Sequence, residues 1–502
     1  MALAATWRFV ILASNAVSFH SDEAIIGLMA RHILQGQPIP TFFYGQAYMG
    51  SLDALLVSLS FRVFGESVLS IRLVQSALYL LTVGTTMLIA LRLSNNRTVA
   101  AIVGVLMALP SPLVALYTTI SLGGYGETLL IGNLLLLTAC EISLRERWNS
   151  WQHWLVLGGL VGLGWWTNNL IVVYIFPVAI LMLRSWRHIV WSRVGGAALA
   201  FFVFSAPWWL YNFTHDWESI HFLSGGFQPV GGGLEDRLLG FLLLGLPAVI
   251  GVRYSWAVNL WASLWVIPLI ILYVGLLVAA SRRASLMWWM LVGIIMIFVG
   301  SSFGVDATGR YLLPMIIPLS ILLAFGAQRL QARWMGAMLG LIMLLIGTNV
   351  IGTGLALRTI PPGLTPQFDP ATDFTNDYDQ QVIDFLHEHG GQYGYATYWA
   401  SYRLAFLSHE TIILSPQLPY KASLVYTSTE RYPAYTDKVA QAKQHVFVTV
   451  NLPALDAIIA QKMTGAAITY TQQAIGPYTV FYDISKEVTP AELGLQDLPA
   501  VP

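Results

Sequence analysis

Long apolar runs alternate with short polar segments over residues 1–355 of the chain. A helix needs about 20 predominantly apolar residues to cross the hydrocarbon core of a bilayer. Roughly eleven runs approach that length, and they lie near residues 5–19, 70–92, 98–117, 127–144, 152–167, 169–183, 194–211, 260–280, 286–302, 311–328 and 334–353. The pattern therefore predicts a polytopic α-helical membrane domain.

Charged residues between these runs separate by sign. Basic residues gather in alternate loops, which hold Arg92, Arg97, Arg145, Arg147, Arg184, Arg187, Arg193, Arg282, Arg283, Arg329 and Arg333. The other loops are acidic and hold Asp22, Glu23, Asp53, Glu66, Glu127, Asp216, Glu218, Glu235, Asp236 and Asp306. Because cytoplasmic loops carry the excess of Lys and Arg, the acidic loops are predicted to be extracytoplasmic, beginning with a first loop at about 20–69.

Three apolar stretches need separate interpretation. Residues 51–64 and 238–252 fit the alternation poorly, and we expect them to be helices lying in the membrane interface. If either crossed the membrane, the C-terminal region would lie in the cytoplasm instead. The run at 7–19 lacks a small-residue cleavage site and is interpreted as a retained first span.

The character of the sequence changes after the last apolar run. Residues 356–376 form a proline-containing linker, with Pro361, Pro362, Pro366 and Pro370. Residues 377–502 predict helices at 378–389, 401–407 and 452–463, strands at 393–398, 411–414 and 445–450, and a hairpin at 467–484. This alternation is typical of a small α/β domain, which the predicted orientation places outside the cytoplasm.

Composition supports the membrane assignment. The chain is 56% hydrophobic with a mean hydropathy of +0.63 and only 10% charged residues, against about 25% charged in soluble domains. Lys plus Arg and Asp plus Glu are equal at 26 each, so no basic excess indicates a nucleic-acid partner. The single cysteine, Cys140, excludes an intramolecular disulfide.

The segment His20-Ser21-Asp22-Glu23-Ala24 follows the first apolar run directly. Adjacent carboxylates at a membrane boundary are costly unless water, a metal ion or a substrate meets them, which makes Asp22 and Glu23 candidates for a functional site. An equally simple interpretation is a solvated helix start, because Ser21 or Asp22 would cap the following helix well.

Four segments together resemble a known family. They are Asp22-Glu23-Ala24, the Ala30-Arg31 to Gly36 spacing, the loop from Tyr44 to Leu52 (YGQAYMGSL), and Gly309-Arg310-Tyr311-Leu312-Leu313-Pro314. In this order the membrane part, about 350 residues, resembles the GT-C glycosyltransferases. The bacterial branch that is similar to protein O-mannosyltransferases and lipid A aminoarabinose transferases is the nearest, whereas the C-terminal domain matches only in position.

The resemblance implies a GT-C-like helical bundle in the bacterial inner membrane that transfers a hexose or pentose. The donor would be a polyprenyl-phosphate sugar, and the acceptor an extracytoplasmic lipid, glycan or protein. It places Asp22, with Glu23 beside it, at the reaction centre. A carboxylate suits an inverting displacement because it can take the acceptor proton and stabilise an oxocarbenium-like state.

Charged candidates for substrate binding lie at the outer ends of predicted spans. Arg310 is placed where a guanidinium could bind the lipid phosphate bidentately, although an interfacial arginine could also simply snorkel. Arg72 and Arg237 are weaker phosphate candidates. Glu127, flanked by glycines, could bind sugar hydroxyls or orient the acceptor, or could only cap its helix.

Aromatic and amide side chains provide further candidates. Trp166 and Asn168 belong to the segment Trp165-Trp166-Thr167-Asn168-Asn169 at an outer tip, where tryptophans are usually aromatic-belt anchors but could also line a sugar cavity. Tyr44, Gln46 and Tyr48 could shape a donor pocket, or be ordinary residues of an interfacial loop.

The sequence does not favour a metal cofactor. His20, His215 and His221 match no compact zinc motif. Asp22 with Glu23 could hold a divalent ion, but the branch resembled here generally works without one.

Two other classes of function share the apolar pattern. A transporter or lipid flippase usually has polar or broken helices near the bilayer midplane, and the charges within the spans that a translocation path would use are scarce here. An inactive scaffold for the C-terminal domain would not need Asp22, Glu127 and Arg310.

Overall fold

The structure is a computed structural model that describes residues 1–222, 233–280, 284–331, 335–358 and 363–500. It divides into two compact units. Unit 1 contains residues 1–15, 47–56 and 72–358, and unit 2 contains residues 16–46, 57–71 and 359–502. Some residues of the predicted basic loops and of the linker lie outside the described residues, namely Arg282, Arg283, Arg333, Pro361 and Pro362.

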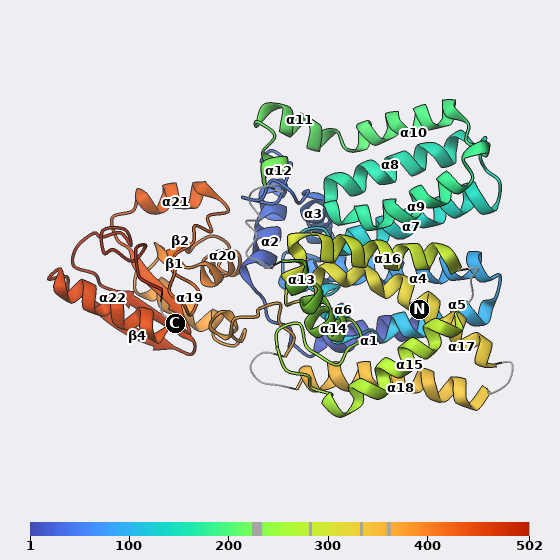
Figure 1. Cartoon of the computed structure of the whole chain (residues 1–502). Coiled ribbons are helices and arrows are strands. Elements are labelled where there is room, and N and C mark those ends of the chain that lie inside the picture. The colour runs from blue at the N-terminus through green and yellow to red at the C-terminus, as the bar shows by residue number, and fades with distance from the viewer. Residues whose placement is uncertain (223–232, 281–283, 332–334, 359–362, 501–502) are drawn as a thin grey trace. The chain divides into compact units, whose positions relative to one another are not determined.

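Unit 1 is built from packed helices (Figure 1). They are α1 (Ala2–Ala13), α4 (Val68–Ser94), α5 (Arg97–Ala108), α6 (Pro112–Tyr117), α7 (Tyr125–Leu144), α8 (Trp151–Thr167), α9 (Val172–Arg184), α10 (Trp191–Phe204), α11 (Ala206–Thr214), α12 (Glu218–His221), α13 (Leu234–Gly240), α14 (Leu246–Val249), α15 (Val266–Ala279), α16 (Ser285–Gly300), α17 (Ile316–Gln331) and α18 (Met335–Ala356). Helix α8 packs against α7 and α10, and α17 packs against α5 and α15. Helix α3 (Leu52–Phe64) begins in unit 1 and continues in unit 2, and α4 begins in unit 2 and continues in unit 1 from Arg72.

Several of these helices have the properties of membrane spans. Within the described ranges, four are long and apolar enough to cross a bilayer: Val68–Ser94, Tyr125–Leu144, Arg310–Arg329 and Met335–Ala356. The pair α10 and α11, bent by 60°, would make a fifth. Five shorter apolar helices accompany them, so a total of about eleven spans stays a prediction.

Prolines interrupt the helices where the apolar pattern is continuous. The predicted run at 98–117 is divided into α5 and α6 around Pro110, and the run at 194–211 bends before Pro207. Proline lacks the N–H that continues a helix and clashes with the preceding turn. The stretch at 238–252, predicted to be one interfacial helix, is likewise irregular, with a π-helical turn at Phe241–Gly245 between α13 and α14.

Unit 2 combines α2 (Ser21–Leu34) with an α/β domain. The domain contains α19 (Asp379–Glu388), β1 (Tyr393–Thr397), α20 (Tyr398–Leu407), β2 (Ile413–Leu418), α21 (Pro433–Ala440), β3 (Val446–Val450), α22 (Pro453–Gly465), β4 (Thr471–Ile475) and β5 (Tyr478–Tyr482). The strand order is β2-β1-β3-β5-β4. Strand β1 pairs in parallel with β2 and β3, and β5 pairs antiparallel with β3 and β4.

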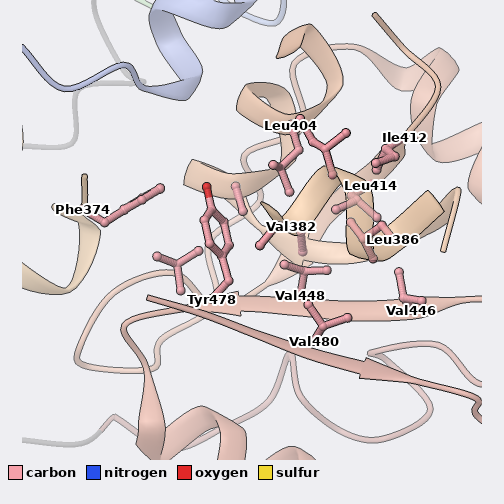
Figure 2. Packing of buried hydrophobic residues seen from close by; sticks show 14 residues of the cluster. Phe374, Val382, Leu386, Leu404, Ile412, Leu414, Val446, Val448, Tyr478 and Val480 are labelled. Carbon is pink, nitrogen blue, oxygen red and sulfur yellow. The ribbon is translucent and has the colours of Figure 1, made fainter. Parts of the chain in front are cut away.

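One face of this sheet forms the core of the α/β domain. Figure 2 shows Val448 from β3 and Tyr478 and Val480 from β5 facing Val382 and Leu386 of α19. Each of these five side chains is fully buried. The alternation of apolar residues along β3 and β5 therefore anchors α19 on the sheet.

The sequence located most of these elements but misplaced two and missed one. Helix α20 begins at Tyr398 instead of 401, and β2 occupies Ile413–Leu418 instead of 411–414. Helix α21 was not predicted. Its eight residues bury only Tyr435 and Val439, which is too few for a visible apolar stripe.

The segment before α2 is hydrogen-bonded into the C-terminal part of unit 2. Leu364 pairs with residues 16 and 18 as a short parallel bridge at 2.7 and 3.1 Å. The Asn376 side chain accepts from Phe19 N at 2.9 Å and donates to Val17 O at 3.2 Å. Arg403, held by Asp379 at 2.7 Å, donates to Phe19 O. These bonds fix the start of α2.

Candidate functional site

The first turn of α2 carries the two predicted catalytic carboxylates. His20 is the N-cap residue, in an extended conformation, and its Nδ1 accepts from Glu23 N at 3.4 Å. The Asp22 side chain is partly exposed, whereas Glu23 is 0% exposed. The positive end of the helix dipole stabilises a carboxylate at this position. Of the two acids, Asp22 is therefore the one that can meet a ligand.

Tyr398, the first residue of α20, positions Asp22. Its hydroxyl donates to Asp22 Oδ1, and its backbone carbonyl accepts from Ser21 Oγ at 2.6 Å. Burial, together with the charge of Asp22, raises the pKa of Tyr398 well above its ordinary value, so the phenol remains a donor. Asp22 Oδ2 accepts no hydrogen bond from any residue that the structure describes. One carboxylate oxygen is fixed and the other is open.

Arg431 lies on the other side of Tyr398. Its Nε is 3.4 Å from the Tyr398 hydroxyl, and its guanidinium lies 5.6 Å from the centre of the Tyr398 ring. With its amide oxygen turned toward the guanidinium, Gln46 accepts from both Nη atoms at 3.0 and 2.8 Å. Gly45 O accepts from Arg431 Nη1 at 3.4 Å. The predicted residue Gln46 is thus linked to Asp22 through two side chains.

Tyr44 belongs to a separate polar cluster in unit 2. Its hydroxyl is 2.9 Å from His32 Nδ1, and His32 Nε2 is 3.1 Å from Glu410. Burial opposes the charge of Glu410, but hydrogen bonds and charges from His32, Tyr435 and Arg31 outweigh it and lower the pKa to about 2. Tyr44 is therefore engaged in a structural ion-pair network, although its ring remains partly exposed.

A second pair of acids lies in unit 1. Asp53, in the first turn of α3, and Glu127, in the first turn of α7, are 0% and 1% exposed. Gln75 Nε2 donates to Asp53 at 3.0 Å and to Glu127 at 3.3 Å, and Ser121 donates to Asp53. Burial raises the pKa of Asp53. Glu127 Oε2 is buried without a hydrogen-bond partner among the described residues.

Glycines create the turn that leads to Glu127. Gly123 and Gly124 have φ of 79° and 90°, a left-handed conformation that other residues adopt at a cost. A side chain at Gly124 would also meet Thr167 at 3.0 Å. The turn therefore requires glycine at both positions.

Tyr48 and Asn168 line a largely apolar cavity of about 100 Å³ in unit 1. Tyr125, Phe298 and Tyr311 form other parts of its wall. The Asn168 amide is occupied by backbone, since Nδ2 donates to Gly123 O at 3.2 Å and Oδ1 accepts from Leu170 N at 3.0 Å. A predicted contact with sugar hydroxyls would use the remaining N–H and the remaining lone pair of this amide.

The tip that carries Trp166 is paired with the Tyr44–Leu52 loop. Met49 and Asn168 form an antiparallel bridge, and Gly50 N donates to Thr167 O at 2.9 Å. A Cβ at Gly50 would lie 2.4 Å from Trp166 O, so the close approach requires glycine. Trp166 is half-buried and is not part of the cavity wall.

Arg310 opens a 3-10 helix, Arg310–Met315, just before α17. Its Nε lies 3.1 Å from Asp306 Oδ2, and its guanidinium lies 5.0 Å from the centre of the Tyr311 ring. The side chain is 38% exposed. A phosphate could bind Arg310 only by displacing the Asp306 carboxylate or by sharing the guanidinium with it.

Sequence reasoning missed Tyr398, Arg431 and Asp53. No local motif marks the first two, because they acquire their position only through the packing of unit 2. Asp53 directly follows the loop that ends at Leu52, and that proximity was an available signal. Over the described residues, no three His, Cys, Asp or Glu side chains gather as a metal-binding group.

Comparison with known proteins identifies similar families and folds. Residues 52–211 match the family model of dolichyl-phosphate-mannose-protein mannosyltransferases. No curated protein matches the chain by sequence. Two crystal structures of ArnT from Cupriavidus metallidurans, one bound to undecaprenyl phosphate and one in the apo state, match with 14% identity and a TM-score of 0.57.

The ArnT matches cover 96% of this chain and 97% of that chain. An oligosaccharyltransferase from Archaeoglobus fulgidus, in complex with zinc and sulfate, matches with 12% identity and a TM-score of 0.44, over 89% of this chain and 66% of that chain. The ArnT matches confirm the predicted fold class, a multi-pass helical membrane bundle with a small C-terminal α/β domain.

Proposed function

We propose that this chain, which has the fold of the GT-C superfamily of membrane glycosyltransferases, transfers a sugar from a polyprenyl-phosphate donor to an acceptor hydroxyl outside the cytoplasm. One of the two similar ArnT structures is bound to undecaprenyl phosphate, which supports a donor of this class. The acceptor is a lipid, a glycan or a protein, and the transferred sugar a hexose or pentose.

The observation that carries the proposal is the environment of Asp22. One carboxylate oxygen is held by Tyr398 and the other is open, at the positive end of α2. This arrangement suits a general base, which must keep a fixed orientation and a free lone pair. Glu23, buried beside it, is proposed to support the local fold of the site.

The proposed reaction is a single in-line displacement. The acceptor hydroxyl donates a hydrogen bond to Asp22 Oδ2 and attacks the anomeric carbon. As the new C–O bond forms, the bond from the anomeric carbon to the phosphate oxygen breaks. The hydroxyl proton passes to Asp22, and polyprenyl phosphate leaves with the bonding electron pair. One displacement inverts the anomeric configuration.

Unit 1 is proposed to contribute to substrate binding. The cavity lined by Tyr48 and Tyr125 is mostly apolar and suits an acyl or prenyl segment. Glu127 Oε2, buried and unpartnered among the described residues, is available to a substrate hydroxyl. Arg310 is proposed to bind phosphate, with Trp166 and Asn168 shaping the neighbouring loop.

A donor panel tests the function. The purified chain in nanodiscs is incubated with undecaprenyl-phosphate monosaccharides and a crude membrane acceptor, and released sugar is measured for wild type, Asp22→Asn and the exposed control Asp437→Asn. We expect turnover with one donor, which is lost in Asp22→Asn and kept in Asp437→Asn. Substrate flux in sealed vesicles, without turnover of any donor, would instead support a transporter.

A further inference from the structure

We propose that a cavity in the α/β domain of unit 2 binds one sugar unit of an uncharged carbohydrate. The cavity has a volume of about 360 Å³, within the range of about 300–1,000 Å³ that is typical of small-molecule sites. Its wall includes Tyr395, Gln417, Tyr426, Glu430, Thr436 and Gln496. None of these six residues belongs to the group around Asp22, so the inference concerns the binding of a sugar and goes beyond the proposed transfer.

The cavity lies on the sheet face that is turned away from α19. Ala396 packs in the core with α19, and its neighbour Tyr395 belongs to the opposite face because side chains alternate along a strand. Thr436 of α21 is fastened to β2 by a hydrogen bond of 2.8 Å between its hydroxyl and that of Ser415. Leu495 is 0% exposed and anchors the C-terminal wall. The walls are therefore held by the fold of the domain itself.

Tyr395 brings an unpartnered hydroxyl to this cavity. The residue is 3% exposed, and its ring packs against His445 and Phe447 with centroids 5.2 and 5.4 Å away. The hydroxyl forms no hydrogen bond with any residue that the structure describes. Since buried tyrosine hydroxyls usually have a partner, we assign the missing partner to a ligand in the cavity.

The charges near Tyr395 keep its hydroxyl a donor. Burial, followed by the charges of Glu492 and Glu487, raises the pKa of Tyr395. The phenol therefore stays protonated at neutral pH and can donate to a sugar oxygen. Glu430 adds a third carboxylate, in the wall itself, and the described lining residues include no Lys or Arg. An anionic ligand such as a phosphate or a uronic acid is therefore disfavoured.

Two glutamine amides provide complementary groups. Gln417 of β2 and Gln496 both line the cavity, and neither side chain forms a hydrogen bond within the described part of the chain. A primary amide has two N–H donors and a carbonyl acceptor, which match the donors and acceptors of neighbouring sugar hydroxyls. The Glu430 carboxylate can accept from further hydroxyls. An apolar ligand would instead cover these amides without satisfying them, at a cost in free energy.

The ring of Tyr426 completes the match to a sugar. It is partly buried in the cavity wall. An aromatic face packs against the C–H face of a pyranose, whose hydroxyls project from the edge of the sugar ring. A peptide backbone offers only one donor and one acceptor per residue, which fits an aromatic face beside two amides and a carboxylate less well. The occupant that the chemistry favours is a neutral pyranose unit of a glycan.

Sugar binding can be measured directly on the full chain. The protein in nanodiscs is mixed with glucose, mannose, galactose, N-acetylglucosamine, glucuronate or the peptide Gly-Asn-Ser-Gly, and saturation-transfer NMR detects bound ligand, with empty nanodiscs as the blank. We expect transfer to at least one neutral sugar and much weaker transfer to glucuronate. Absence of transfer to every neutral sugar, or transfer to the peptide alone, overturns the inference. Glucuronate that binds as strongly as the neutral sugars contradicts an uncharged occupant.

Two variants test whether the bound sugar lies in this cavity. Tyr395→Phe removes only the hydroxyl and should raise the Kd of the best-bound sugar by about threefold to tenfold, as for one lost neutral hydrogen bond. Gln417→Ala removes a whole amide and should raise this Kd by about tenfold. The matched controls Tyr393→Phe, on the same strand but outside the cavity, and Gln461→Ala, exposed on α22, should bind like wild type. Unchanged affinity in both cavity variants overturns the assignment.

Folding and catalysis are controlled separately. Thermal unfolding identifies a destabilised variant, and if Tyr395→Phe is destabilised, Gln417→Ala decides, because Gln417 is partly exposed. Asp22→Asn should bind the sugar like wild type, since Asp22 does not line the cavity. Loss of binding in Asp22→Asn would assign the sugar to the catalytic site and overturn the inference. Tyr395-dependent binding in a protein that transfers no sugar overturns the proposed function alone, whereas transfer without such binding overturns the inference alone.

Discussion

Asp22 in unit 2 and the pair Asp53 and Glu127 in unit 1 hold carboxylates in opposite environments. Asp22 is partly exposed, lies at a helix start and has a phenol on one oxygen. The unit 1 pair is fully buried and accepts hydrogen bonds from the neutral side chains of Gln75 and Ser121. Two buried carboxylates that interact favour sharing one proton.

The difference separates an acid that is placed to act as a base from a buried pair in which one oxygen of Glu127 is proposed only to bind a substrate hydroxyl. A general base must offer an accessible lone pair, and Asp22 is partly exposed with one oxygen that accepts no hydrogen bond from the described residues. Asp53 and Glu127 are instead joined by Gln75, which donates to both carboxylates and so ties α3 to α7. Sequence position alone does not distinguish these roles, because Asp22, Asp53 and Glu127 all lie in the first turns of helices.

The largest expected effect is on turnover. Asp22→Asn should lower kcat by about a thousandfold, because Asn can accept from Tyr398 but cannot take a proton. The same isosteric change in the other environment, Glu127→Gln, should keep the rate within about tenfold of wild type, since the amide keeps the size of the side chain and an oxygen that can accept from Gln75. Comparable losses of kcat in both variants would contradict the different roles of Asp22 and Glu127.

Arg310 provides a test of how strongly a basic side chain contributes to donor binding. Arg310 is paired with a carboxylate, Asp306, at 3.1 Å. Arg310→Ala should therefore raise the KM for the lipid donor by only several-fold, because part of the charge of Arg310 is already neutralised. The comparison is measured by initial rates against donor concentration. A much larger rise in KM would contradict the partial neutralisation of Arg310 by Asp306.

The Asp53–Glu127 pair also predicts a difference in stability between two variants of Glu127. Glu127→Ala should lower the free energy of unfolding by about 2–3 kcal/mol, because it leaves a cavity and removes a hydrogen-bond partner of Gln75. Glu127→Gln should cost less than about 1 kcal/mol. Both are measured by thermal or denaturant unfolding in one detergent. Equal destabilisation would mean that Glu127 is ionised in the folded protein.

Asp373 provides the smallest and most specific test. It belongs to unit 2, as Asp22 does, but burial raises its pKa to about 7. Its folded pKa exceeds the ordinary value, so its contribution to stability is complete at low pH and is lost as the pH rises through about 7. The melting temperature should fall modestly between pH 5 and 8. Asp373→Asn should weaken this dependence of the melting temperature on pH. An unchanged dependence in the variant would contradict the raised pKa of Asp373.

The sequence predicted most of the fold because its strongest signals are local. Apolar runs identified the membrane helices, and alternation identified β1, β3 and β5. Prolines shifted the helix breaks at Pro110 and Pro207, where a local rule competes with a continuous apolar pattern. Helix α21 was missed because only two of its residues are buried.

The candidate site was less predictable because its contacts are distant in the sequence. Asp22 was identified from its motif, but its hydrogen-bond partner Tyr398 is 376 residues away. Arg431 reaches Gly45 across 386 residues. Such pairs depend on the packing of the whole unit, and no local spacing encodes them.

The bonds that fix the start of α2 also set an order for the synthesis of the protein. Asn376, which accepts from Phe19 N, lies 357 residues later in the chain. Arg403, which donates to Phe19 O, lies 384 residues later. A chain that emerges from its amino end therefore contains Asp22 long before it contains the groups that hold it. A chain that ends before Asn376 lacks these groups, so the C-terminal domain supplies the residues that hold the start of α2.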